Sequence, residues 1–171
     1  MIRLRQYKSI DAEKIAEWVK DEDAFLKWGG KLFCEYPITA QIIDEKYRLK
    51  NGDCKEPDNF YPWMAFDDNG VVGHFIMRYL NGDKKTLRFG WVVVDDSVRG
   101  KGYGTQMLSL GLKYAFEILG VDVVTLGVFE NNDLAHNCYK KVGFKDREKV
   151  KKEPWDVIEM EIGREDFEKR I

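Results

Sequence analysis

The chain has few of the residues that build metal sites and disulfide frameworks. It contains 3 cysteines and 2 histidines, and no CxxC pair occurs. The odd number of widely spaced cysteines (Cys34, Cys54 and Cys138) is typical of a reducing compartment, so we expect a cytoplasmic protein. Because His74 and His136 are the only imidazoles, neither a structural zinc site nor any other metal is predicted.

The sequence also lacks a strong charge of one sign and a long hydrophobic run. Its 28 basic and 30 acidic residues give a net charge of −2, which provides no broad basic field for nucleic acid. No apolar run approaches the roughly 20 residues that a membrane-spanning helix needs. The first five residues lack the apolar core of a secretion signal. We therefore expect one soluble domain over residues 1–171, with neither nucleic acid nor membrane as a partner.

Hydrophobic spacing and turn residues predict helices first and an antiparallel meander next. Ser9 is placed to cap a first helix, a second spans residues 22–28, a third begins at Thr39, and residues 53–62 form an irregular loop. The order strand, helix, strand after the meander implies a right-handed parallel crossover. The remaining expected elements are strands at 2–5, 63–66, 71–80, 87–94, 121–128, 145–150 and 155–162, and helices at 102–119 and 133–141.

A glycine-rich turn separates the strand that ends in Val92–Val94 from the next helix. Its alternate glycines lie at 100, 102 and 104, and Arg99 and Lys101 flank the first of them. Such a turn lets the backbone approach a ligand closely and presents free N–H groups at the positive end of a helix dipole. It is suited to a phosphate-bearing ligand. The spacing matches neither GxGxxG nor GxxxxGK[ST], and a flexible loop that merely contains glycines is the alternative.

A second candidate segment covers residues 132–144. Helical spacing brings Asn132, Ala135 and Tyr139 near one face. For Tyr139 alone, a half-buried core aromatic with its hydroxyl at the rim is the simpler interpretation.

Together, the two segments resemble the GNAT superfamily of acyl-CoA N-acyltransferases. Residues 99–104 (RGKGYG) are similar to its (Q/R)xxGx(G/A) motif. Residues 132–144 (NDLAHNCYKKVGF) are similar to its second conserved segment. One helix and one strand separate them, as in that family, and the element order resembles the whole domain. The resemblance implies an α/β fold with a mixed, mostly antiparallel sheet, helices on both faces and splayed parallel central strands.

The resemblance also implies an activity and the residues that carry it. The reaction is direct transfer of an acetyl group from acetyl-CoA to a primary amine of a small molecule or protein in a ternary complex. Tyr139 matches the general acid that protonates the departing thiolate, and a backbone N–H of the strand would stabilise the oxyanion. The residues expected to bind coenzyme A are Val92, Val93, Val94, Arg99, Gly100, Lys101, Gly102, Tyr103, Gly104, Thr105 and Asn132.

The chain departs from the family pattern at the general base. Many relatives carry a glutamate on one of the two splayed strands, but the corresponding positions here hold Arg88 and Gly127. Ordered water, Glu130, His74 or Glu35 could take the proton, and none of them is assigned.

The acceptor amine is the least specified partner. Acidic residues in the first third of the chain would form a rim that favours a cationic acceptor such as a polyamine, an aminoglycoside or a peptide amine. The alternative is that they are solvated helix charges. They are Asp21, Glu22, Asp23, Glu35, Asp44, Glu45, Asp53, Glu56 and Asp58. A homodimer through residues 121–128 or the C-terminal segment stays open.

Two functions from other classes compete with the enzyme. The first is a non-catalytic acyl-CoA sensor or regulatory domain, which the missing glutamates favour and Tyr139 disfavours. The second is a nucleic-acid-binding protein that uses a basic C-terminal stretch, although the acidic net charge argues against it. The basic residues of that stretch are Lys145, Arg147, Lys149, Lys151 and Lys152.

Overall fold

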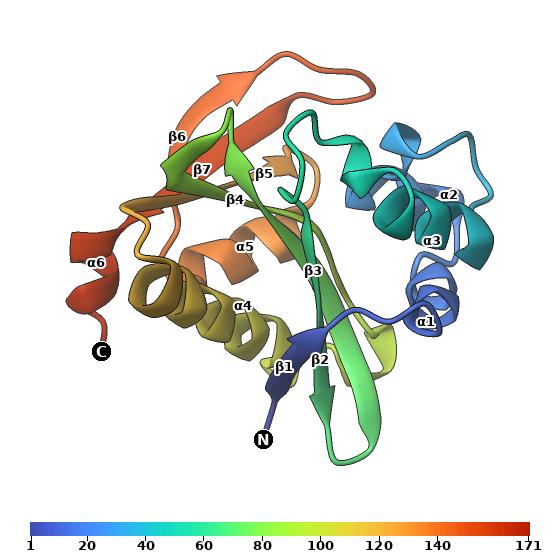
Figure 1. Cartoon of the computed structure of the whole chain (residues 1–171), viewed down its shortest axis with the longest axis horizontal. Coiled ribbons are helices and arrows are strands. Elements are labelled where there is room, and N and C mark those ends of the chain that lie inside the picture. Colours follow the sequence, from blue (N-terminus) through green and yellow to red (C-terminus); the bar gives the residue numbers. More distant parts are fainter.

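A seven-stranded sheet runs through the middle of the molecule (Figure 1). The computed structural model of the chain describes all residues from Met1 to Ile171. The spatial order of the strands is β1-β2-β3-β4-β5-β7-β6, and every neighbouring pair is antiparallel except β4 and β5. The strands are β1 (Arg3–Gln6), β2 (Tyr61–Asp67), β3 (Gly70–Leu80), β4 (Asp83–Val94), β5 (Val123–Phe129), β6 (Lys145–Val150) and β7 (Val157–Gly163).

Helices cover both faces of this sheet, as predicted (Figure 1). One face carries α1 (Asp11–Trp18), α2 (Glu22–Trp28) and α3 (Ala40–Arg48). The other carries α4 (Tyr103–Lys113), α5 (Asp133–Val142) and α6 (Arg164–Glu168). Each layer buries its own core against the sheet: Phe25 and Ile43 lie in the first, and Phe75 and Leu108 in the second.

Two local predictions need correction. Ser9 does not cap α1, because the helix begins after Ile10 without a side-chain cap. Instead, the Asp11 carboxylate accepts a hydrogen bond from the Lys8 amide (2.7 Å) and two from Arg5 (2.7 and 2.8 Å). The helix predicted over residues 102–119 is also not uniform, since its last part, Tyr114–Leu119, is π-helical.

The parallel pairing of β4 with β5 stops early. Residues Thr86, Leu87 and Arg88 pair with Val123, Val124 and Thr125, and no pair follows. Yet β4 continues to Val94, bonded only to β3, and β5 continues to Phe129, bonded only to β7. The two central strands therefore separate, as the family resemblance implies, and residues 89–94 keep unpaired backbone groups toward the gap.

A bulge in β4 lies at the start of this separation. Ile76 of β3 pairs with Gly90, but His74 pairs with Val93, so β4 holds one extra residue. Trp91, within the bulge, has a φ of +43°, which is rare for a bulky side chain. Such a conformation costs roughly 1–3 kcal/mol and persists where its surroundings enforce it.

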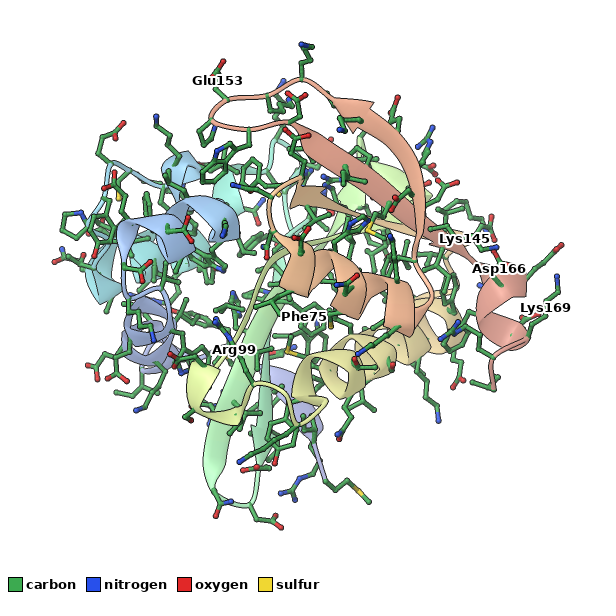
Figure 2. The ribbon with its side chains drawn as sticks, turned by 180° about the vertical axis from the view of Figure 1, so that it is seen from behind. Phe75, Arg99, Lys145, Glu153, Asp166 and Lys169 are labelled. Carbon is green, nitrogen blue, oxygen red and sulfur yellow. The ribbon has the colours of Figure 1, made fainter.

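Close helix packing fixes the position of the glycine-rich turn relative to the sheet. A Cβ added to Gly111 of α4 would lie 2.8 Å from the Phe75 ring, so the helix backbone sits directly on the sheet. A Cβ at Gly104 would lie 3.2 Å from the Cys138 Sγ atom, which brings α4 equally close to α5. Phe75 lies between these helices and the sheet in Figure 2.

The sheet edges bear on self-association. β5 lies inside the sheet between β4 and β7, so residues 121–128 offer no outer edge to a second copy. The outer strands are β1 and β6, and β6 is exposed and rich in charged residues, a pattern that resists edge-to-edge pairing. None of the helices combines the length and the apolar character needed to cross a membrane.

Candidate active site

The glycine-rich turn adopts the backbone conformation that its sequence predicts. Gly100 and Gly102 have φ values of +79° and +78°, in the left-handed region that favours glycine. Apart from the adjacent residues of the chain, no protein atom lies within 4 Å of a Cβ built at Gly100. At Gly102 only the side-chain Nε2 atom of Gln106 does, at 4.0 Å. The turn is therefore open on its outer side.

Backbone donors at the start of α4 face this opening without protein partners. The first backbone hydrogen bond of the helix runs from the Gln106 backbone N–H to the Gly102 carbonyl oxygen. The amides of Tyr103, Gly104 and Thr105 consequently have no backbone acceptor. No side chain caps the helix either. These N–H groups and the helix dipole form a site for an anion.

The side chains of the turn divide into two kinds. Arg99 and Lys101 are exposed, and Figure 2 shows Arg99 at the turn before α4, far from Lys145 and Asp166. The Tyr103 hydroxyl donates to Asp67 (3.0 Å), and the Thr105 hydroxyl lies 3.7 Å from the Cys138 thiol. Tyr103 and Thr105 thus offer backbone amides to a ligand, while Arg99 and Lys101 offer charge.

The strand before the turn supplies an unpaired edge. Val93 is buried against the α1–α3 layer, and Val92 and Val94 pack against the opposite core. On the side away from β3, these residues have no β5 partner. An extended ligand chain can therefore hydrogen-bond to this backbone as an additional strand would.

Tyr139 and Asn132 lie on α5, on the other side of the gap. Tyr139 is 6% exposed, and its ring packs edge-to-face against Phe144. Its hydroxyl makes no hydrogen bond within the protein. Burial raises the pKa of this phenol above its ordinary value of 10. Asn132 caps α5 through a bond accepted from the Ala135 amide (3.4 Å), which leaves its side-chain N–H groups free.

A cavity of about 530 Å³ opens beside the separated strands. The end of α2, the loop at residues 52–56 and the diverging parts of β4 and β5 line it. One wall is aromatic: it contains Trp28, Phe60 and Trp91, and the Trp28 and Trp91 ring centroids lie 6.3 Å apart. The cavity is continuous with the gap, because Gly90 and Trp91 of β4 and Gly127 and Val128 of β5 belong to its lining.

Comparison with known proteins agrees with this geometry. A family model described as an acetyltransferase (GNAT) domain matches residues 2–145. The chain belongs to the GNAT acetyltransferase family.

Individual relatives are distant in sequence. The chain is 25% identical to acetyltransferase PseH of Campylobacter jejuni over 145 residues, which is 84% of this chain and 85% of that protein. Aminoglycoside acetyltransferase AAC(6')-Ib in complex with coenzyme A has a TM-score of 0.80 at 20% identity, covering 99% of this chain and 98% of that one. Spermidine N-acetyltransferase from Vibrio cholerae, with coenzyme A and spermine, has a TM-score of 0.78 at 19% identity, covering 97% of each chain. At these identities the solved structures establish the shared fold.

This GNAT domain has no carboxylate at the positions where many relatives carry the base. Arg88 donates two hydrogen bonds to the Glu159 carboxylate of β7, at 2.7 and 3.1 Å. Gly127 leaves room for this pair, since a Cβ there would lie 2.9 Å from the Arg88 Nη2 atom. Glu159 could not be identified from the sequence, because its approach to Arg88 depends on β7 pairing next to β5. The guanidinium occupies both oxygens of this carboxylate in a charge-assisted pair.

The three base candidates named from the sequence do not line the cavity beside the separated strands. Glu35 is exposed, and Glu130 pairs with Lys149 (2.9 Å). His74 is fully buried, and its Nδ1 atom lies 2.9 Å from the Trp63 carbonyl oxygen, so that nitrogen carries the proton. The other ring nitrogen then accepts from the Tyr47 hydroxyl (2.8 Å). His74 is a neutral core residue of the sheet.

The burial of His74 predicts a pH dependence of stability. Burial lowers its pKa from 6.5 to about 4. Between these values the unfolded chain binds more protons, so the free energy of unfolding falls as the pH is lowered through that window, by up to about 1.4 kcal/mol per pH unit. Above pH 6.5 the imidazole is neutral in both the folded and the unfolded chain, so His74 no longer changes the free energy of unfolding with pH. Urea unfolding of the wild type and of H74Q at pH 7 and pH 5 should show this component only in the wild type.

The matched control is H136Q, which removes the other imidazole, paired with Asp146 at the surface. We expect it to keep the full pH dependence of the wild type. An unchanged pH dependence in H74Q would contradict the assignment of His74 as a buried neutral group.

Proposed function

We propose that the protein is an acetyl-CoA-dependent N-acetyltransferase that moves an acetyl group directly to a primary amine. The observation that carries this proposal is the set of unpartnered amides at residues 103–105, directly beyond a strand that has left its parallel neighbour. This places an anion site and an open strand edge end to end. Coenzyme A has a matching order of parts, with a pyrophosphate followed by an extended arm and the thioester. Solved neighbours of the same fold hold coenzyme A.

The cosubstrate would be held mainly by backbone groups. The pyrophosphate would accept hydrogen bonds from the turn at residues 100–105, with Arg99 and Lys101 adding charge-assisted contacts. The pantetheine arm would lie along Val92–Val94, and the free amide group of Asn132 would hydrogen-bond to it. No group of three or more histidine, cysteine or acidic residues lies close enough together to hold a metal ion.

The chemistry assigned to this chain needs two proton transfers. The amine attacks the thioester carbonyl carbon, the carbon–sulfur bond breaks, and the sulfur leaves as a thiolate that takes a proton. We assign that proton to the Tyr139 hydroxyl, which has no hydrogen-bond partner within the protein and whose raised pKa keeps it protonated at neutral pH. None of the side chains named as base candidates from the sequence (Glu35, His74 and Glu130) lines the cavity, so we assign removal of the amine's proton to ordered water, the candidate that remains.

We do not infer the charge of the acceptor from the solved neighbours. Of the nine acidic residues expected to form a rim, Asp53 and Glu56 line the cavity, and Asp53 already pairs with Lys46. An acidic rim that selects a cationic acceptor is therefore not supported by this arrangement. The three cysteines are free thiols, which fits our expectation of action in the reducing cytoplasm.

A non-catalytic acyl-CoA sensor is the second candidate, and the absence of a carboxylate base at Arg88 and Gly127 favours it. The cavity beside the gap supports the enzyme, because a sensor needs no second substrate site. Release of free thiol from acetyl-CoA in the presence of a panel of amines separates the two functions. Thiol release that depends on the amine supports the enzyme, and tight coenzyme A binding without it supports the sensor.

Substitution of Gly102 tests the anion site. We expect G102V to weaken coenzyme A binding at least tenfold, because the left-handed conformation is lost and each charge-assisted hydrogen bond is worth roughly 1.5–3 kcal/mol. Titration calorimetry measures the affinity. The matched control is G120V at the other end of the same helical run, where φ is +70° and no atom lies within 4 Å of an added Cβ. If G102V and G120V bound coenzyme A with equal affinity, the turn would not be part of the binding site.

Substitution of Tyr139 tests the proton donor. We expect Y139F to lower kcat roughly 100-fold or more, the usual contribution of a positioned acid, while coenzyme A affinity stays the same. Steady-state kinetics and calorimetry give the two quantities. Y114F serves as the control, since Tyr114 packs against Trp63 and does not line the acceptor cavity. A Y139F enzyme with the kcat of the wild type would eliminate Tyr139 as the acid.

A further inference from the structure

Arg78 is a half-buried cation without an acidic partner. It lies on β3, on the face of the sheet that carries α1–α3, and lines the acceptor cavity. It also lines an adjoining hollow of about 350 Å³ between β3 and the β6–β7 hairpin. The guanidinium has no ion pair or hydrogen bond within the protein, although it carries five N–H donors in a planar fork. A carboxylate or phosphate is the group that such a fork binds best.

The neighbour of Arg78 across the sheet makes this lack of a partner unfavourable. Arg78 pairs in register with Arg88 of β4, so two like charges stand opposite each other on one face. Glu159 compensates Arg88 by accepting two hydrogen bonds from it. No corresponding carboxylate reaches Arg78. Glu159 compensates the charge of Arg88 only. An anion bound at Arg78 would reduce the repulsion that remains between the two arginines.

The surrounding charges are positive on balance. The whole chain carries a net charge of −2, yet six cationic and four acidic side chains line the two connected cavities. The acids are Asp53, Glu56, Glu148 and Glu159. The cations are Lys27, Lys55, Arg78, Arg88, Arg147 and Lys152. Ion pairs hold Lys27, Arg88 and Arg147, which leaves Arg78, Lys55 and Lys152 as the unpaired cations of this lining beside two unpaired acids. A small positive excess in a cleft of an acidic protein favours anionic ligands.

We propose that the acceptor amine carries an anionic group, a carboxylate or a phosphate, and that Arg78 binds it. This inference rests on the proposed N-acetyltransferase function and specifies its acceptor. The Arg78–Arg88 pair lies two residues along the strands from the Ile76–Gly90 pair, which borders the gap. Two residues of strand span roughly 7 Å. A small amine could therefore be anchored by its anionic group while its nitrogen reaches the thioester beside Gly90.

The test compares matched amines that differ in the anionic group. Glucosamine 6-phosphate is compared with glucosamine, and 4-aminobutyrate with butylamine, by thiol release from acetyl-CoA. The two pairs also distinguish phosphate from carboxylate recognition. We expect the anionic member of at least one pair to have a kcat/KM at least about tenfold higher, and R78Q to remove that preference. R78K, which keeps the charge but loses the fork, should retain part of it.

Inorganic phosphate provides a readout that does not depend on turnover. It is titrated by calorimetry into protein saturated with coenzyme A, so that the glycine-rich turn is already filled. We expect binding to the wild type and at least about tenfold weaker binding to R78Q. R3Q is the matched control, because Arg3 lies on the distant edge strand β1 and pairs with Asp68. Cooperative urea unfolding of each variant shows that it is folded.

Each outcome decides the inference. Phosphate binding that R78Q loses and R3Q keeps supports it, as does a preference for the anionic amine that depends on Arg78. The absence of phosphate binding, equal binding by R78Q, or faster acetylation of glucosamine, butylamine, spermidine or kanamycin than of the anionic amines would overturn it. Failure of the protein to bind coenzyme A at all would instead contradict the proposed function.

Discussion

The separation of β4 from β5 is the constraint on which the active site depends. Three residue pairs hold the two parallel strands together, and beyond Arg88 and Thr125 the backbone of β4 has no partner on that side. Unpaired backbone groups inside a fold cost free energy unless something binds them. The sheet tolerates the gap because β3 and β7 hold the outer sides of the two strands along their length. An extended ligand chain can satisfy the edge that remains.

The strained bulge links this gap to the acceptor side. The Trp28 indole donates to the Trp91 carbonyl (2.9 Å), and the Trp91 indole donates to the Gly29 carbonyl (3.3 Å). These reciprocal bonds help hold Trp91 at its positive φ and join the end of α2 to β4. The N-terminal helices that shape the acceptor cavity are thereby positioned relative to the strand that would carry the thioester.

The replacements at Arg88 and Gly127 form one coupled unit with Glu159. The small residue at 127 makes space for the guanidinium, and the guanidinium in turn binds the carboxylate of β7. The family's acidic position has been exchanged for a cation whose charge is compensated from the next strand. What distinguishes this cavity electrostatically is therefore the second arginine, Arg78, which has no such compensation.

Much of the fold could be predicted from local sequence signals. The strands at 63–66 and 71–80, the helix at 22–28 and the helix that begins at Thr39 follow from short-range features. The structure has a hairpin of β2 and β3, a helix with a left-handed end at Gly29 and a helix capped by Thr39 there. The order strand, helix, strand predicted the parallel crossover, and the alternate glycines predicted the open turn. The Ser9 cap failed because Asp11, held by Arg5 of a neighbouring element, accepts the local amide bond instead.

The charges around the acceptor could not be predicted in the same way. Whether an acidic residue lines a cavity depends on tertiary packing, which composition does not encode. Most of the acidic residues in the N-terminal helices face elsewhere, and Arg78 and Glu159 meet the site only because β3 and β7 flank the separated strands. The pairing of Arg78 with Arg88 depends on the strand register. A shift of one residue would turn the side chains of one strand to the other face of the sheet.

A crystal structure of the protein with coenzyme A would show whether the separated strands bind it. We expect the pyrophosphate to lie against the amides of residues 100–105, with the pantetheine arm hydrogen-bonded to the backbone of Val92–Val94 in the gap beside β5. Coenzyme A bound elsewhere, or β4 and β5 closed on each other along Phe89–Val94, would contradict it.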